Sequence, residues 1–138
     1  MQSVTVTRDV DVPPDVVRER IADVPSFMRA AGFDDVAVDG DRMRIANTVG
    51  WLFEIELDLQ MVERDDAVLA YEQRDGIFEA MTTAYWVDEG VGGSTVRATT
   101  EFALDVAYAG PAFDATVVQR QRRAEITKQF DYLESGER

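Results

Sequence analysis

Residues 51–63 read Trp-Leu-Phe-Glu-Ile-Glu-Leu-Asp-Leu-Gln-Met-Val-Glu. Apolar side chains occupy each odd position from Trp51 to Met61, whereas Glu, Asp and Gln fill the even positions from 54 to 60. Because successive side chains of a strand point to opposite faces, this alternation predicts a long strand with one buried and one solvated face. Strands of this kind are typical of an antiparallel sheet that covers a core on one side.

Strand-like segments continue on both sides of this stretch. They are residues 3–12, 35–39, 42–49, 67–74, 77–88 and 94–106. In the segment 77–88 the alternation places one set of side chains on a common face, namely Ile77, Glu79, Met81, Thr83, Tyr85 and Val87. The turn sequences Asp39-Gly40-Asp41 and Asp75-Gly76 lie between neighbouring segments and favour hairpins. The sequence therefore predicts consecutive antiparallel strands within one domain of residues 1–138.

Proline and glycine mark where helices begin and end. Pro13-Pro14-Asp15 follows the first strand and opens a short helix. Pro25 ends that helix, and Ser26 caps a second short helix that stops at Gly32. Pro111 lies at the expected first turn of a long helix that runs to about Leu133.

The two halves of this long helix carry apolar residues on different faces. Ile126, Phe130 and Leu133 are spaced as a stripe that packs on the sheet. Phe113 and Val117 lie on another azimuth. We therefore expect the C-terminal half to clamp the sheet and the N-terminal half to line a different space.

Missing residue types exclude several classes of chemistry. The chain has no cysteine and no histidine. Disulfides, thiolate metal sites, histidine-based triads and zinc hydrolysis with imidazole ligands are therefore excluded. We expect no cofactor and no metal.

The charge balance points to a salt-rich cytoplasm. Asp and Glu number 27 against 14 Lys and Arg, and Lys128 is the only lysine. At molar salt the Debye length falls to about 3 Å, which screens the repulsion of a net charge of −13. This composition is typical of halophilic archaea, and it argues against nucleic acid as a partner. No apolar run is long enough for a membrane span and no signal peptide is recognisable, so we expect a cytoplasmic location.

Two charged clusters are candidates for a site. Glu54, Glu56 and Asp58 share one strand face, and that face is the solvated one, so ordinary surface acid is the favoured interpretation. Arg120, Arg122 and Arg123 form the only cationic cluster. Arg122 falls near the azimuth of the Ile126 stripe, so a guanidinium at the cavity mouth that binds a ligand carboxylate or phosphate is one hypothesis. The alternative is that the three arginines pair with surface carboxylates.

Aromatic side chains are plentiful on the strands expected to form the core. A ligand pocket is usually lined by such groups with a few polar side chains among them. Packing in the core is the alternative, and for Tyr71 and Tyr85 the two interpretations are balanced because a buried hydroxyl needs a partner. Thr83 and Gln73 are possible polar contacts of the same kind.

Three sequence features resemble the START-like, or helix-grip, superfamily of polyketide cyclase/dehydrase and lipid-transport proteins. The first is Val10-Asp11-Val12-Pro13-Pro14-Asp15-Val16-Val17 before the first helix. The second is Gly93-Ser94-Thr95-Val96 before the last strand, and the third is Gly110-Pro111 before a helix with Phe130 and Leu133. The resemblance spans about residues 3–135 and implies a seven-stranded antiparallel sheet around a long C-terminal helix, with a cavity between them.

The resemblance also implies what such a cavity holds. We expect it to bind an apolar or amphipathic small molecule, for example a lipid, a quinone or a polyketide. The expected ligand-binding residues are Phe27, Phe53, Tyr71, Met81, Tyr85, Phe113, Val117 and Arg122.

Two other functions stay open at the level of sequence. One is an enzyme of the cyclase/dehydratase type that uses a cavity carboxylate or tyrosine, and the other is a protein-interaction module. A cavity without ionisable groups favours binding, a cavity carboxylate favours catalysis, and a filled core with a large exposed apolar patch favours interaction.

Overall fold

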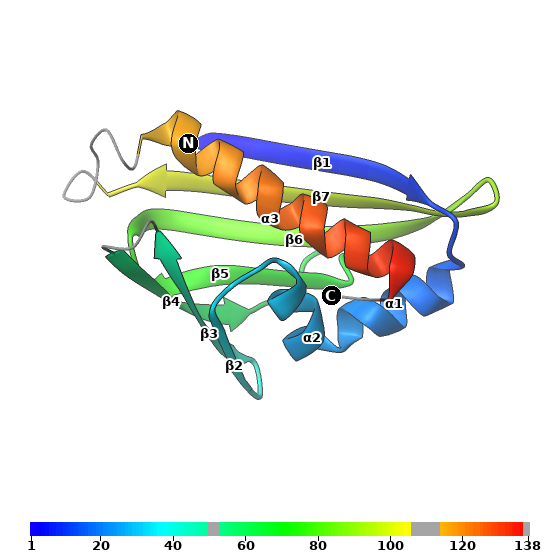
Figure 1. Cartoon of the computed structure of the whole chain (residues 1–138), viewed down its shortest axis with the longest axis horizontal. Coiled ribbons are helices and arrows are strands. Elements are labelled where there is room, and N and C mark those ends of the chain that lie inside the picture. Colours follow the sequence, from blue (N-terminus) through cyan, green and yellow to red (C-terminus); the bar gives the residue numbers. More distant parts are fainter. Residues whose placement is uncertain (50–52, 106–113, 137–138) are drawn as a thin grey trace.

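The computed structural model describes residues 1–49, 53–105 and 114–136, which form one sheet and three helices (Figure 1). The strands are β1 (Gln2–Val10), β2 (Asp35–Asp39), β3 (Arg42–Val49), β4 (Phe53–Met61), β5 (Leu69–Asp75), β6 (Phe78–Gly90) and β7 (Gly93–Leu104). All neighbouring strands are antiparallel, and their order across the sheet is β1-β7-β6-β5-β4-β3-β2. The predicted α+β helix-grip architecture is confirmed.

The connection between the first two strands crosses the whole sheet, because β1 and β2 lie at opposite edges. This connection carries α1 (Pro14–Ala22) and α2 (Val24–Ala30). Pro14 occupies the first turn of α1, where a missing N–H costs nothing. Figure 1 shows both short helices at the end of the sheet where the C-terminal half of the last helix arrives.

The long helix α3 (Ala115–Ser135) lies across one face of the sheet (Figure 1). The side chains of Ile126, Phe130 and Leu133 are at most 1% exposed, which confirms the predicted clamp on the sheet. The helix begins later than the proline suggested. Asp114 is its N-cap and accepts a hydrogen bond from the backbone N–H of Val117 at 2.9 Å, while Pro111 lies outside the described residues.

The start of β6 departs from simple alternation. The pairing of β6 with β7 shifts between Phe78 and Ala80, as in a β-bulge. As a result Phe78 is buried and Glu79 is exposed, although the alternation predicted that Glu79 shares a face with Met81 and Thr83. From Met81 to Val87 the predicted common face is present, and it is the buried face of the strand.

The glycine before β7 has a packing reason. A Cβ at Gly93 would collide with the backbone of Val10 and Val12, where the end of β1 passes close by. Ser94 then donates a hydrogen bond from its hydroxyl to the carbonyl oxygen of Val12 at 2.6 Å. The Gly-Ser pair therefore fixes the point at which β1 leaves the sheet toward α1.

Candidate functional site

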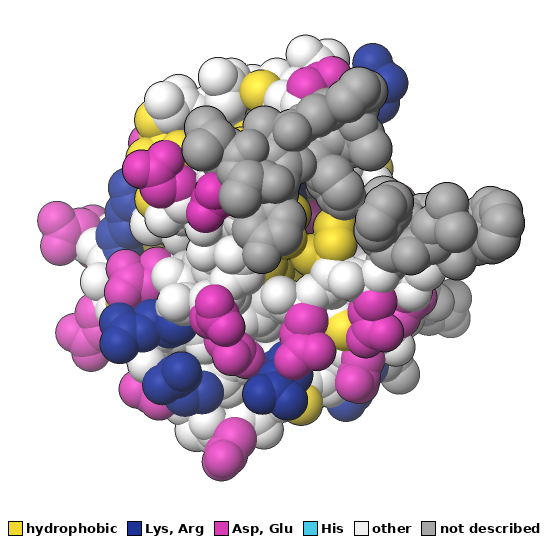
Figure 2. All heavy atoms as spheres, turned by 90° about the vertical axis from the view of Figure 1, so that its left-hand side faces the viewer, with side chains coloured by type: hydrophobic (Ala, Val, Ile, Leu, Met, Phe, Trp, Pro, Cys, Tyr) yellow, Lys and Arg dark blue, Asp and Glu magenta, His cyan; other side chains and the backbone are white. Residues whose placement is uncertain are grey.

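A cavity of about 110 Å³ lies between the N-terminal half of α3 and the inner face of β3 to β6. It reaches the surface at the start of α3, where Val117 lines it with 36% of its area exposed. Figure 2 looks at this end of the molecule and shows hydrophobic side chains near its centre. The lining residues are Phe33, Ile45, Asn47, Ile55, Leu57, Tyr71, Ile77, Phe78, Met81, Val117, Val118, Gln121, Arg122 and Glu125.

Most of the cavity wall is apolar because it is built from the inner faces of strands. Ile55 and Leu57 are two apart on β4, and Ile45 faces Leu57 across the β3–β4 pair. Phe78 reaches the wall through the bulge at the start of β6. The alternation that builds the sheet therefore also builds an apolar pocket.

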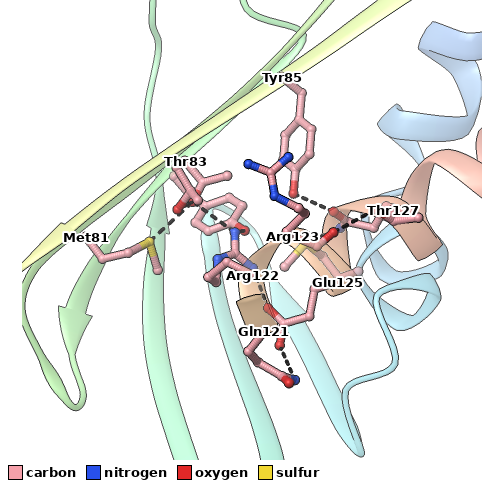
Figure 3. A network of polar contacts seen from close by, with 12 residues as sticks. Met81, Thr83, Tyr85, Gln121, Arg122, Arg123, Glu125 and Thr127 are labelled. Carbon is pink, nitrogen blue, oxygen red and sulfur yellow. Dashed lines mark hydrogen bonds and ion pairs between the residues drawn. The ribbon is translucent and has the colours of Figure 1, made fainter. Parts of the chain in front are cut away.

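One polar cluster interrupts this wall, and it is centred on Arg122 (Figure 3). The Nη1 atom of Arg122 donates to Oε1 of Glu125 at 2.6 Å, three residues along the same helix. Its Nη2 atom donates to the Thr83 hydroxyl at 3.2 Å and the Tyr71 hydroxyl at 3.4 Å. The cluster therefore joins α3 to β5 and β6 across the cavity.

The ion pair is buried, with 8% of the Arg122 side chain and 7% of the Glu125 side chain exposed. Burial alone would lower the pKa of Arg122, but Tyr71 and the Glu125 carboxylate together raise it above its ordinary value. The guanidinium is therefore charged inside the protein, and Glu125 balances that charge. Oε2 of Glu125 also accepts a hydrogen bond from the Gln121 amide at 3.1 Å.

The Arg122 guanidinium does not use all of its donors. Its Nε–H has no hydrogen-bond partner among the described residues, and it is shielded from solvent. A buried donor of a charged group is costly to leave unpaired, so such a group points to a strained site or a missing partner.

A second polar contact lies deeper. The Tyr85 hydroxyl donates to Oε1 of Gln129 at 2.7 Å, and the ring of Phe27 packs edge-on against Tyr85 with centroids 4.9 Å apart. Burial and the neighbouring Tyr71 raise the pKa of Tyr85 well above its ordinary value. The Tyr85–Gln129 bond therefore joins β6 to α3.

The structure separates the eight expected ligand-binding residues into three groups. Tyr71, Met81, Val117 and Arg122 line the cavity. Phe27 and Tyr85 are at most 1% exposed and lie in the packed layer beneath it. The side chain of Phe53 and the whole of Phe113 lie outside the described part of the chain.

The other ten of the fourteen lining residues were not predicted to bind a ligand, and Glu125 and Phe33 are among them. Glu125 did carry a usable signal, because it lies three positions after Arg122 and directly before Ile126 of the buried stripe. No sequence pattern around Phe33 predicted its place in the wall. It lies in the segment between α2 and β2, and the course of that segment brings it to the cavity. Gln73, a suggested polar contact, bonds the backbone of Phe78 through its amide.

The other acidic cluster is a surface feature. Arg44 lies 3.0 Å from Glu56 and 3.2 Å from Asp58 on the outer face of β3 and β4. Within the residues that the structure describes, no group of His, Cys, Asp and Glu could hold a metal ion. The solvated-face interpretation of these carboxylates agrees with this arrangement.

The chain shares its fold with many solved structures. It resembles the protein TTHA0849 from Thermus thermophilus with a TM-score of 0.77 and 16% identity over 97% of this chain and 95% of that one. It resembles the ZhuI aromatase/cyclase from Streptomyces sp. R1128 with a TM-score of 0.73 and 18% identity, over 96% and 93% of the two chains. The protein XoxI from Bacillus cereus gives a TM-score of 0.76 and 14% identity, over 99% and 95%.

At these identities the likeness establishes the fold, and the chain has the START-like helix-grip fold. No protein-family model matches the sequence, and neither does any curated protein. In the described part of the chain, no helix combines the length and the apolar character that a membrane crossing needs.

Proposed function

We propose that this protein binds an apolar or amphipathic small molecule in the cavity between α3 and the sheet. The observation that carries the proposal is an apolar wall with one built polar cluster, the arrangement by which small-molecule sites combine affinity with orientation. A protein that shares this fold, ZhuI, is an aromatase/cyclase, and this likeness supports the proposal.

The size of the cavity bounds the buried part of the ligand. An apolar cavity of about 150 Å³ is able to hold benzene. A cavity of about 110 Å³ is smaller than that, so it suits a short alkyl segment or part of a single ring. A longer ligand would extend past Val117 toward the surface.

The test is native mass spectrometry of protein purified from a halophilic host, compared with the same sample after denaturing extraction. A co-purifying small molecule at near one-to-one stoichiometry supports binding and gives its mass. Protein that carries no molecule, and takes up none from a lipid extract of the host, contradicts the proposal.

A second candidate function is catalysis of the cyclase/dehydratase type, and one observation favours it. Glu125 places a carboxylate in the cavity wall, beside a guanidinium that could stabilise negative charge on a substrate oxygen. Incubation of the recovered molecule with the wild type and with Glu125→Gln tests this candidate. With the wild type alone, loss of water seen as a change of mass, or a change of chromatographic retention at constant mass as a cyclisation gives, supports catalysis. An unchanged molecule with both proteins supports simple binding.

The interaction-module hypothesis finds little support in the described residues. The exposed large apolar side chains there are Met1, Val62, Val91 and Val117, which lie on four separate parts of the chain. Scattered single residues of this kind are normal on a protein surface.

A further inference from the structure

The polar cluster of the cavity carries information about the chemistry of the ligand. Arg122 is held by partners on three elements, namely Glu125 on α3, Tyr71 on β5 and Thr83 on β6. Because these contacts fix the guanidinium in place, its remaining N–H groups also have fixed directions. A donor fixed in advance selects for an acceptor without further ordering of the protein.

The charge of the cluster limits which acceptor fits. The Arg122 guanidinium and the Glu125 carboxylate are 2.6 Å apart and together carry no net charge. A ligand carboxylate or phosphate would add an uncompensated negative charge to a buried site that already holds Glu125. One nitrogen of the guanidinium, Nη1, is already paired with the protein's own carboxylate.

A neutral acceptor avoids this cost. A carbonyl oxygen can accept from a guanidinium N–H without adding charge to the site. Among the described residues, two of the five N–H groups of Arg122 have no partner, one on Nε and one on Nη1, and the guanidinium side chain that carries them lines the cavity. The apolar wall formed by Ile55, Leu57 and Met81 suits the hydrocarbon part of the same molecule.

We propose that the bound molecule presents a neutral hydrogen-bond acceptor, such as a ketone, quinone or ester carbonyl oxygen, to the Arg122 guanidinium. This inference rests on the ligand-binding function proposed above, and it deepens that function by naming the chemical class. It predicts a preference for a neutral carbonyl compound over both the matching hydrocarbon and the matching carboxylate.

Three single-ring probes separate these cases: acetophenone, ethylbenzene and benzoate. Each is titrated into the full-length protein in molar KCl, and binding is followed by the NMR signal of the Met81 methyl group, which lines the cavity. We expect acetophenone to bind about tenfold tighter than ethylbenzene, the range of one hydrogen bond to a charged donor. Benzoate is expected to bind more weakly than acetophenone.

Two variants test whether Arg122 causes the preference. Arg122→Met combined with Glu125→Leu replaces the buried pair by apolar side chains and leaves no lone charge. In this double variant the ratio of the two affinities should fall to near one. Arg123→Met removes an exposed arginine from the same helix and should keep the ratio of the wild type.

The outcomes distinguish this inference from the function on which it rests. Equal binding of acetophenone and ethylbenzene to the wild type, or tightest binding of benzoate, overturns the chemical class while small-molecule binding stands. Failure of all three probes to shift the Met81 signal overturns both. The comparison of probes in the wild type decides the matter even if the double variant does not fold.

Discussion

At the scale of single residues, Arg122 and Glu125 form the buried ion pair on which the cavity's chemistry depends. Arg122 is 7% exposed and Glu125 is 6% exposed. Removing one member of a buried pair leaves the other as an uncompensated charge. The two residues are therefore expected to behave as a unit in mutagenesis.

The prediction concerns the free energy of unfolding. Arg122→Met alone should cost about 3–5 kcal/mol, whereas Arg122→Met with Glu125→Leu should cost much less or nothing. Chemical denaturation in constant KCl measures both. The exposed pair of Arg44 with Asp58 is the control, because breaking a surface pair costs at most about 1 kcal/mol. Equal losses in the single and the double variant would contradict this account.

A second prediction at this scale concerns pH. Burial and the nearby Tyr71 raise the pKa of Tyr85, whereas in the unfolded chain a tyrosine ionises near pH 10. Above that pH the unfolded chain loses the proton first, so stability should fall by up to about 1.4 kcal/mol per pH unit. The unfolding free energy of Tyr85→Phe, measured from pH 7 to 11, should fall less steeply above pH 10. Parallel profiles of variant and wild type would rule out this role of Tyr85.

The residue scale also shows what the sequence could reveal about the site. Four of the residues expected near a ligand do line the cavity, namely Tyr71, Met81, Val117 and Arg122. They could be predicted because the face of a strand or helix on which a residue lies follows from its position in the repeat. The only sequence signal for Glu125 was its position three residues after Arg122 and directly before Ile126. In a chain with 27 acidic residues, that spacing alone did not single it out.

At the scale of elements, the turn between β5 and β6 sets the shape of the cavity wall. Gly76 has a φ of +155°, and a Cβ there would collide with Leu57 and with the amide of Gln73. That amide bonds both the N–H and the carbonyl oxygen of Phe78, at 3.1 and 2.8 Å. The turn therefore holds Phe78 in the bulge that brings it to the cavity.

Gly76→Ala should lower the free energy of unfolding by about 1–3 kcal/mol, since a new methyl group forces neighbours to move. Gly40→Ala is the matched control, because Gly40 also has a positive φ of +60° but no atom within 4 Å of its Cβ position. It should show only the smaller backbone cost, of about 1 kcal/mol. Chemical denaturation of both variants measures the difference, and equal losses would speak against the crowding at Gly76.

Elements were predicted well where a regular period runs through them, and poorly where a local contact interrupts the period. The alternation in β4 and β7 persists in the folded sheet. At the bulge Phe78 is buried and Glu79 is exposed, and the amide of Gln73 bonds the backbone of Phe78 across the turn. Pro111 suggested that α3 begins earlier than it does. The helix begins after Asp114, whose side chain caps it by accepting from the backbone N–H of Val117.

At the scale of the whole molecule, the sheet order could be expected only through the resemblance to helix-grip proteins. Alternation predicts strands, but it does not state that β1 lies beside β7 at one edge of the sheet. The net charge, in contrast, is a direct property of the sequence. It leads to a prediction about the medium in which the protein is stable.

A net charge of −13 repels itself, and salt screens that repulsion. We expect the free energy of unfolding in urea to rise as KCl is increased from 0.2 to 2 M. A variant with Glu54→Gln, Asp88→Asn and Glu89→Gln removes three exposed charges and should depend less on salt. A free energy of unfolding that does not change with KCl would contradict the prediction that the protein is adapted to a salt-rich environment.

The most direct test of the central claim is ligand occupancy in variants that change the cavity mouth. Val117 lines the cavity and is 36% exposed, while Val62 is 38% exposed and is not among the cavity-lining residues. Wild type, Val117→Trp and Val62→Trp are purified side by side, and native mass spectrometry measures the fraction that carries a small molecule. A ligand in the cavity predicts high occupancy in the wild type and in Val62→Trp, and low occupancy in Val117→Trp. Equal occupancy in all three proteins, full or empty, would contradict it.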